Sequence, residues 1–351
     1  MTADIGRAAP GRVVGRQRVQ RITPTRLAFA LIVVVLLVAG PSLFGAYWTR
    51  VLINCMVYAI AASGIALLYG RLGLVSLGQV SLLGVGGWVA LRFGHATGAP
   101  FEVTLLVAAA VTCVIGVVVG LPALRLSGLN LAIVTLMLAG AFEVVFTVTG
   151  FPNGGDGFLG RTEGGVLQTR LDRPALGESD PAYFRYVLIV TVLVFLLLAV
   201  HLATRPGRGW AAIRQSEAGA LASGVDTVRY RLWALALVSA TTGLAGGLLA
   251  GINGLLDPIS FRASQSILLF ATVLIGGAFS LTGALLAGLL SQGLPPVLDS
   301  LGVNGNLVFV LLGLGMVQAI TTAPRGIAGQ LSGLAAAADR RRQARAGRDT
   351  R

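Results

Sequence analysis

The residues that could take part in chemistry are concentrated in the polar segment 205–231, which reads RPGRGWAAIRQSEAGALASGVDTVRYR. Pro206-Gly207 is expected to end the preceding apolar run. A short helix is then expected to continue to Gly224, a residue suited to the left-handed position that follows a helix. Asp226 is placed to cap the next helix. The segment therefore predicts a short helix held between two turns.

The helix predicted in 205–231 is amphipathic. Three apolar side chains share one stripe and two polar side chains lie near it, namely Trp210, Ile213 and Leu221 with Arg214 and Glu217. A short amphipathic helix between two turns has the form of an element that docks into a groove on another protein. The alternative is an interfacial helix that lies on lipid headgroups, and the pattern alone leaves both interpretations open.

A second group of candidates consists of polar side chains inside apolar runs, where burial is costly without a compensating role. These are Asn54, Gln79, Asn130 and Glu143. The simplest role is a hydrogen bond between helices, and we favour it for Asn54 and Asn130. Glu143, a carboxylate about two turns inside its run, is left open between a structural and a functional role.

Several chemistries are excluded by composition. All 27 basic residues are arginine, and a chain without lysine has neither a nucleotide-binding P-loop nor a lysine nucleophile. His95, His201, Cys55 and Cys113 lie far apart, so no zinc site, redox CxxC pair or disulfide framework is expected. The loop 153–157 lacks the spaced carboxylates of a calcium loop. We predict no cofactor, no metal and no catalytic residue, and we do not expect an enzyme.

The elements that must position these residues are membrane helices. The chain has 351 residues, of which 55% are hydrophobic and 12% are charged. A soluble domain has about 25% charged residues. At about 20 apolar residues a span, the supply suffices for about nine or ten spans. The predicted fold class is all-α, a polytopic membrane bundle of about ten helices.

Ten apolar runs can be placed along the chain. They are 27–45, 51–70, 72–93, 102–123, 129–149, 186–204, 232–255, 266–280, 281–298 and 306–323. The first is longer than the core of a signal peptide and lacks a convincing cleavage site, so we expect an uncleaved span. The runs 266–280 and 281–298 are short and are candidates for broken or re-entrant helices. Together the runs predict a membrane domain over 27–323.

Charge predicts how this domain is oriented. Basic segments at 1–26 and 324–351 flank it, and arginine next to membrane spans marks the cytoplasmic side, so both termini are predicted there. The loop 150–185 has four arginines against five acidic residues, a net of −1, and is predicted outside. The segment 205–231 has five arginines against two acidic residues, a net of +3, and is predicted inside.

The excess of arginine over acidic residues is therefore concentrated in the segments that are predicted to lie inside. Arg50 and Arg92 fall on the predicted outer side and are exceptions to the rule. The net charge of +13 is concentrated in two tails and one loop, so membrane lipid is an expected partner and nucleic acid is not. The 48 glycines, about twice the usual share, predict close packing of helices through small residues.

The segment 207–224 also resembles a known motif. Its pattern Gly-Arg-x-x-x-Ala-Ile-Arg-x-x-Glu-Ala-x-Ala-x-x-x-Gly, with Glu217-Ala218 at its centre, is similar to the cytoplasmic EAA loop of ABC importer permeases. The chain resembles the branched-chain amino acid permeases of the LivM and LivH type from about residue 50 to 325. Further stretches agree with that family, namely 57–62, 73–79, 124–128, 132–136, Glu143, 149–154 and 273–277.

The resemblance implies a multisubunit importer. In this family two permease subunits form a pore, and each docks its loop helix on a separate ATPase. The implied partners are a second, LivH-like permease subunit, two ATP-binding cassette subunits and an extracytoplasmic solute-binding protein that meets the loop 150–185. The implied solute is a branched-chain or related small amino acid. Ile65-Ala66 and Phe151 depart from the family pattern, so urea, amides and other amino acids stay open.

The resemblance also implies residue roles. In the loop helix, Trp210, Ile213 and Leu221 would be packing anchors on the ATPase, and Arg208, Arg214 and Glu217 would be polar contacts. Gly224 would set the bend that transmits movement. The residues proposed to line the translocation pathway are Gln79, Asn130, Thr135 and Glu143.

Competing interpretations use other features of the chain. The location implied by the resemblance is a bacterial cell membrane, which the chain crosses several times. The first alternative is an ion-coupled secondary transporter or channel that works without ATPases, but such proteins place several acidic or histidine groups at mid-membrane. The second is a membrane-embedded enzyme, which would need a cluster of His, Asp or Glu on facing helices.

Overall fold

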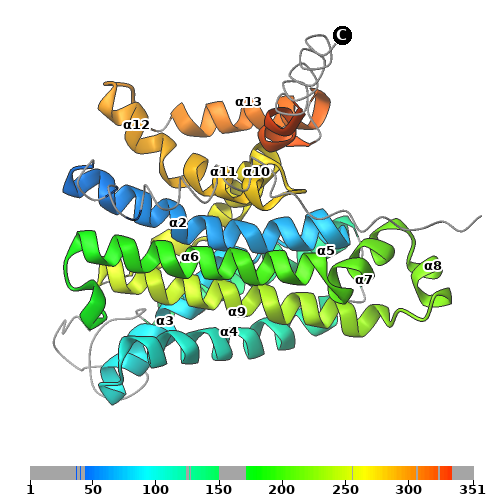
Figure 1. Ribbon diagram of the computed structural model, residues 1–351, viewed down its shortest axis with the longest axis horizontal. Coiled ribbons are helices and arrows are strands. Elements are labelled where there is room, and N and C mark those ends of the chain that lie inside the picture. Colours follow the sequence, from blue (N-terminus) through cyan, green and yellow to red (C-terminus); the bar gives the residue numbers. More distant parts are fainter. Residues whose placement is uncertain are drawn as a thin grey trace, which may run out of the picture.

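The computed structural model describes residues 37, 40, 44–123, 126, 128–149, 171–254, 256–305, 307–322 and 325–333. Every regular element within these residues is helical, so the all-α prediction is confirmed for this part of the chain. Long helices run side by side in a bundle, and the shorter helices that follow residue 262 pack along one of its sides (Figure 1).

Within the residues that the structure describes, five helical stretches are long and apolar enough to cross a membrane. They are α2 with the following π-helical turn η1 (Ala46–Leu67 and Leu68–Leu72), α4 (Phe101–Ala123), α5 (Leu129–Thr149), α6 (Asp180–Ala203) and α9 (Thr227–Asn253). A hydrocarbon layer requires about 20 residues of helix. The runs predicted at 51–70, 102–123, 129–149, 186–204 and 232–255 are therefore confirmed as helices. The fourth of them begins at Asp180, because Ser179 caps it and Pro181 occupies its first turn.

The other helices are shorter. Besides two short helices in 205–231, they are α3 (Gln79–Thr97), α10 (Ala263–Gly276), α11 (Leu281–Gln292), α12 (Leu294–Ser300) and α13 (Leu307–Thr322), with 3-10 turns η2 (Ala175–Gly177) and η3 (Pro258–Phe261). The axes of α11 and α12 meet at 42°, which confirms that the run 281–298 is broken. The described residues thus hold five spans, or six if the bent pair counts as one, and the number ten is not confirmed. The predicted run 27–45 lies almost wholly outside these residues.

The predicted run 72–93 is wrong at its start. Gly73 takes a left-handed conformation with φ 72°, which ends η1, and residues 73–78 are not helical. The N–H of Leu77 donates to Thr135 Oγ1 at 2.9 Å in place of a helical hydrogen bond. Helix α3 therefore begins at Gln79, and six residues of non-helical backbone lie within the bundle.

Close backbone approach joins α3 to α9. A Cβ atom added at Gly86 would lie 2.3 Å from the carbonyl oxygen of Gly243, and one at Gly246 would lie 2.1 Å from that of Leu83. No larger residue fits at either position without separating the helices. Lipid supplies no hydrophobic drive between helices, so contacts of this kind hold membrane bundles together. The prediction of tight packing through small residues is confirmed at this interface.

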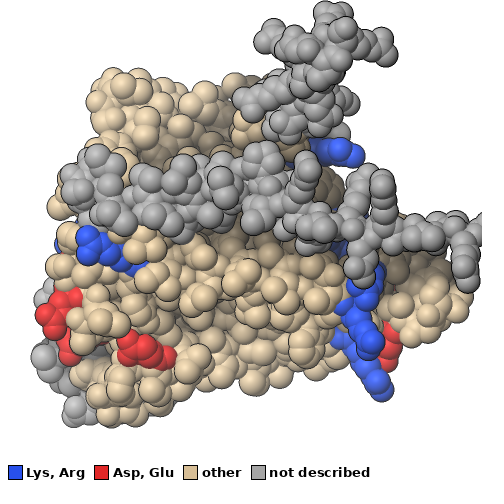
Figure 2. Space-filling model, in the orientation of Figure 1, with Lys and Arg blue, Asp and Glu red and all other residues tan. Residues whose placement is uncertain are grey.

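The two ends of the bundle differ in charge. Figure 2 shows most of the visible basic side chains at the end that carries α7 (Arg205–Gln215) and α8 (Glu217–Ala222), and most of the visible acidic side chains, with a smaller basic patch, at the opposite end. This separation agrees with the predicted inside location of 205–231. The segments 1–26 and 334–351 lie outside the described residues, so a cytoplasmic location of both termini stays a prediction.

Candidate functional site

The segment 205–231 folds as two short helices rather than one. Helix α7 begins after Thr204 and has Pro206 in its first turn, where the missing N–H of proline removes no helical hydrogen bond. Ser216 then interrupts the helix. Its backbone is extended, and its hydroxyl accepts the N–H of Gly219 at 3.1 Å. The expectation of one continuous helix is wrong because serine is a better N-cap than helix-interior residue.

The turn that follows α8 has the predicted form. Gly224 has φ 78°, and the N–H of Val225 donates to the carbonyl of Ala220 at 3.0 Å. The side chain of Asp226 accepts the N–H of Arg229 at 3.1 Å and caps α9. Both the left-handed glycine and the aspartate cap are therefore confirmed.

Two of the three stripe residues pack inside the chain. Trp210 is 0% exposed and Ile213 is 5% exposed. The indole Nε1 of Trp210 donates to the carbonyl of Tyr230 at 2.9 Å, and a Cβ at Gly209 would lie 2.3 Å from the Tyr230 ring. The expectation that Trp210 and Ile213 anchor a partner does not fit this burial, since both side chains are covered by the chain itself and Trp210 fixes α7 to the first turn of α9. Leu221 is 56% exposed and remains available to a partner.

The predicted polar contacts are divided in the same way. Arg214 donates to the backbone carbonyls of Tyr69 and Gly70 in η1. Glu217 Oε2 lies 2.8 Å from Nη2 of Arg231, and this pair joins α8 to α9. Arg208 is exposed on α7. Two of the three charges thus have partners within the chain.

Helix α8 is exposed over most of its length. Four of its exposed residues form a surface that we call the α8 face, namely Glu217, Ala218, Leu221 and Ala222. Helix α7 is fixed to the bundle by its buried side, whereas α8 stands at the end of the molecule (Figure 1). The segment is therefore built as an anchored helix followed by a projecting one.

Two of the four candidate pathway residues meet at one cavity. Gln79 and Thr135 line a cavity of about 60 Å³ between η1, the 73–78 stretch, α3, α4, α5 and α9. Its walls are mostly apolar, and Ser76 and Ser239 are its other polar side chains. A water molecule needs about 10–15 Å³ measured in this way, so the space admits several waters or a small organic group.

Unsatisfied polar atoms lie on the cavity wall. Gln79 is 1% exposed, and its Nε2 donates to Thr242 Oγ1. Within the part of the chain that the structure describes, Gln79 Oε1 and Ser239 Oγ are buried and have no hydrogen-bond partner. Buried polar atoms without partners are rare in native proteins and call for a ligand or a water. The cavity therefore offers an acceptor and a hydroxyl to a polar group inside apolar walls.

The backbone beside the cavity is supported by hydroxyl groups from other helices. Thr135 Oγ1 accepts the N–H of Leu77, and Ser266 Oγ of α10 accepts the N–H of Val80 at 3.2 Å. Non-helical backbone at membrane depth is tolerated where protein or a water-filled cavity satisfies its polar groups. The sequence contained both residues, but nothing in it paired the hydroxyls with this stretch.

The other two candidate pathway residues lie elsewhere. Asn130 is exposed near the first turn of α5 and does not line the cavity. Glu143 Oε2 accepts the N–H of Ala263 at 3.0 Å, and its Oε1 lies 3.8 Å from Nε of Arg262. A carboxylate at the start of α10 is stabilised by the positive end of the helix dipole. Glu143 thus joins α5 to α10 and does not line the cavity.

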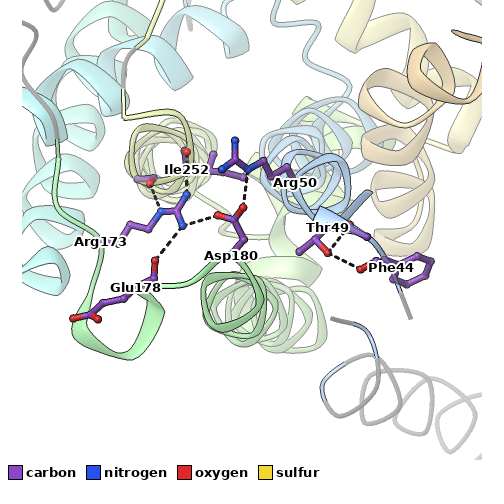
Figure 3. A network of polar contacts seen from close by, with 9 residues as sticks. Phe44, Thr49, Arg50, Arg173, Glu178, Asp180 and Ile252 are labelled. Carbon is purple, nitrogen blue, oxygen red and sulfur yellow. Dashed lines mark hydrogen bonds and ion pairs between the residues drawn. The ribbon is translucent and has the colours of Figure 1, made fainter. Parts of the chain in front are cut away.

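The end of the bundle opposite α8 holds an ion-pair network that sequence reasoning missed. Arg173 Nη1 lies 2.7 Å from Asp180 Oδ1, and Arg50 Nε lies 2.8 Å from Asp180 Oδ2 (Figure 3). Arg173 also donates to the carbonyls of Gly251 and Ile252, in the last turn of α9, at 3.1 and 3.3 Å. The network therefore joins α2, α6, α9 and the 171–179 segment.

A signal for this network was present in the sequence. Arg50 was an exception to the positive-inside distribution, and the structure pairs it with a carboxylate. The residues of the network also form one wall of a polar hollow of about 490 Å³ at this end. An arginine on the wrong side of a membrane protein is thus a reason to look for an acidic partner.

Comparison with known proteins identifies the family. Residues 47–320 match the family described as branched-chain amino acid transport system / permease component. The chain is 28% identical over 280 residues to the high-affinity branched-chain amino acid transport system permease protein LivM of Salmonella typhimurium and to that of Escherichia coli. These alignments cover 75% of this chain and 66% of each relative, so the chain spans slightly less than two thirds of the LivM proteins.

A third relative is a protein named LivH. The chain is 26% identical over 279 residues to a probable branched-chain amino acid transport permease protein LivH of Methanocaldococcus jannaschii. This alignment covers 77% of this chain and 88% of the relative. No solved structure matches the chain. Because the family match extends from α2 to α13 and includes the α7–α8 segment, this chain belongs to the branched-chain amino acid transport permeases.

Proposed function

We propose that this chain is the permease subunit of an ABC importer in a bacterial cell membrane. With a second, LivH-like permease subunit it forms the passage for branched-chain or related small amino acids. Two ATP-binding cassette subunits drive it from the cytoplasm, and an extracytoplasmic solute-binding protein delivers the solute. The observation that carries the proposal is the family match, which includes a projecting helix with an exposed face at the basic end of the bundle.

We propose that the driving subunits are separate proteins. A chain without lysine has no P-loop of its own, so energy from ATP has to reach it through contact with a motor subunit. The α8 face supplies the contact surface, with Leu221 as its apolar centre and Glu217 and Ala218 beside it. Trp210 and Ile213 act behind it by fixing α7 to the bundle.

The solute passage is assigned to the neighbourhood of the cavity. Gln79 Oε1 and Ser239 Oγ are free to bind polar groups of a solute, and the apolar walls suit an aliphatic side chain. Thr135 holds the 73–78 backbone in place beside them. We propose that Glu143 positions α10 and does not contact the solute, since its carboxylate is engaged by Ala263 and Arg262. That engagement also weighs against an ion-coupled transporter, which uses mid-membrane carboxylates as proton or ion carriers.

Co-purification tests the proposed function. The tagged chain, purified from its native membrane, should bring ATP-binding subunits with it. Leu221→Asp places a charge on the α8 face and should remove them, because a desolvated charge at the centre of an interface is costly. Leu176→Asp changes an exposed leucine at the opposite end and is the matched control.

The outcomes separate two parts of the proposal. Wild-type chain purified without any nucleotide-binding subunit would contradict the importer assignment. Normal recovery of those subunits with Leu221→Asp would contradict only the α8 face. The solute is tested by the accumulation of labelled leucine, isoleucine, valine and urea in cells with and without the gene.

A further inference from the structure

One arginine at the cytoplasmic end touches three elements. Arg214 lies in the last turn of α7, and its Nη1 donates to the carbonyl oxygens of both Tyr69 and Gly70 in η1. Its guanidinium carbon lies 5.8 Å from the centre of the Tyr69 ring and 4.8 Å from that of Phe279. Phe279 belongs to the 277–280 turn between α10 and α11. Arg214 thus joins α7 to η1 and to this turn.

The chemistry of the contact is specific to arginine. The last carbonyls of a helix carry partial negative charge, which attracts a cation. A planar guanidinium donates to two carbonyls and lies over aromatic rings at the same time, whereas an ammonium group is a compact point charge. The contacted turn is π-helical, a form often found at functional positions within longer helices. Arg214 therefore does more than mark the cytoplasmic side.

The contacted elements are also packed on one another. A Cβ atom at Gly70 would lie 2.1 Å from the carbonyl oxygen of Ala278, so η1 and the 277–280 turn are in backbone contact. The rings of Tyr69 and Phe279 lie 6.2 Å apart. A displacement of α7 that moves Arg214 must therefore act on both elements together.

The η1 turn leads directly to the cavity. After Gly73 the chain continues through the non-helical stretch 73–78, which ends at Gln79 on the cavity wall. Leu68, in the first position of η1, lines the same cavity. The path from Arg214 to the cavity thus runs along about ten consecutive residues, from Tyr69 to Gln79.

We infer that Arg214 is the positioning residue that transmits movement of the cytoplasmic α7–α8 segment to η1 and the 277–280 turn, and through them to the cavity wall. The inference rests on the proposed function, in which a motor subunit moves this segment. It changes the role of Arg214 from a contact with that subunit to a contact within the permease. The α8 face then binds the motor subunit, and Arg214 transmits the resulting movement of the α7–α8 segment.

The contact of Arg214 with η1 and the 277–280 turn can be tested without measuring transport. Hydrogen exchange is measured by mass spectrometry on the full-length chain in its membrane complex, for wild type, Arg214→Lys and Arg229→Lys. Arg229 is an exposed arginine at the same end, paired only with its helical neighbour Asp226 among the described contacts, and is the matched control. Arg214→Lys should speed exchange in 68–74 and 277–280 by about tenfold, the change expected when a charge-assisted hydrogen bond is lost. Unchanged hydrogen exchange in both segments would show that Arg214 does not hold η1 and the 277–280 turn in place.

Transmission is tested on the same variants. With Arg214→Lys, ATP-binding subunits should still co-purify and basal ATP hydrolysis should persist, while solute uptake and its stimulation of hydrolysis fall by about tenfold or more. Arg229→Lys should match wild type in all four measurements. Coupled uptake at the wild-type level with Arg214→Lys would overturn the inference, even with faster exchange. Failure of the wild-type chain to bind any ATPase would instead contradict the proposed function. The hydrogen-exchange result would still show whether Arg214 holds η1 and the 277–280 turn in place.

Discussion

At the scale of single residues, the carboxylate of Asp180 pairs with two arginines that differ in solvent exposure. The side chain of Arg173 is 18% exposed and that of Arg50 is 59% exposed. Arg173 also lies over the Tyr183 ring, with its guanidinium carbon 5.1 Å from the ring centre, and donates to the end of α9. The energetic weight of the network should therefore rest on Arg173, since exposed ion pairs contribute little.

Alanine substitution tests this division. Arg173→Ala leaves the last carbonyls of α9 without this donor and Asp180 with Arg50 as its remaining arginine partner, and should lower the free energy of unfolding by about 1–3 kcal/mol. Arg50→Ala removes an exposed partner of the same carboxylate and should cost less than about 1 kcal/mol. Thermal unfolding of the two purified variants, compared with wild type, measures the difference. An equal loss for both variants would show that burial does not decide the energy here.

At the scale of elements, the α7–α8 segment divides its tasks between two helices. Buried Trp210 and Ile213 fix α7, and Ser216 ends it and starts α8. Gly224 then reverses the chain with a left-handed backbone, and Asp226 starts α9. The direction in which α8 projects is thus set by one serine and one glycine.

Gly224→Leu tests the importance of that direction. A left-handed conformation costs a residue with a side chain about 1–2 kcal/mol, so the turn should rearrange and α8 should change direction. Uptake should then be lost while the abundance of the protein stays normal. Gly302 has φ 74° in the turn after α12, so Gly302→Leu strains a similar turn at the other end and should leave coupling intact. Uptake by Gly224→Leu at the wild-type level would contradict a role for this turn in coupling.

At the scale of the whole molecule, the bundle has two chemically different ends. One end carries the +3 segment with α7 and α8, and the other carries the Arg50–Asp180–Arg173 network. The apolar helices between them leave large aliphatic side chains of α4, α5 and α6 exposed along their length, as lipid contact requires. The two ends of the bundle are therefore expected to lie on opposite sides of the membrane.

Labelling of introduced cysteines tests the orientation. After Cys55 and Cys113 are replaced by alanine, Ser223→Cys should react with an impermeant maleimide only from the cytoplasmic side. Leu176→Cys, at the opposite end, should react only from the outside, because both positions are exposed at their ends. Reaction of both cysteines from the same side would contradict the two-ended arrangement.

The sequence by itself determined the helical class, the positions of the long helices and the family. Twenty apolar residues in a row have few alternatives to a membrane helix, because lipid cannot satisfy the backbone. Gly224 and Asp226 were also identified correctly, since a left-handed turn and an N-cap depend on local residue types. The break at Ser216 depends on local chemistry as well, but a helical pattern on both sides concealed it.

Only the tertiary structure decided which side chains are free to act. Trp210 and Ile213 form an apolar stripe that suits a partner or the chain's own bundle equally well, and burial against Tyr230 and the neighbouring helices settled the choice. The sequence predicts a partner contact for Arg214 and leaves the role of Glu143 open, and the residues that they contact lie 145 and 120 residues away in the sequence. A sequence pattern specifies which face of a helix is apolar or charged. What covers that face depends on contacts between distant segments, which no local pattern records.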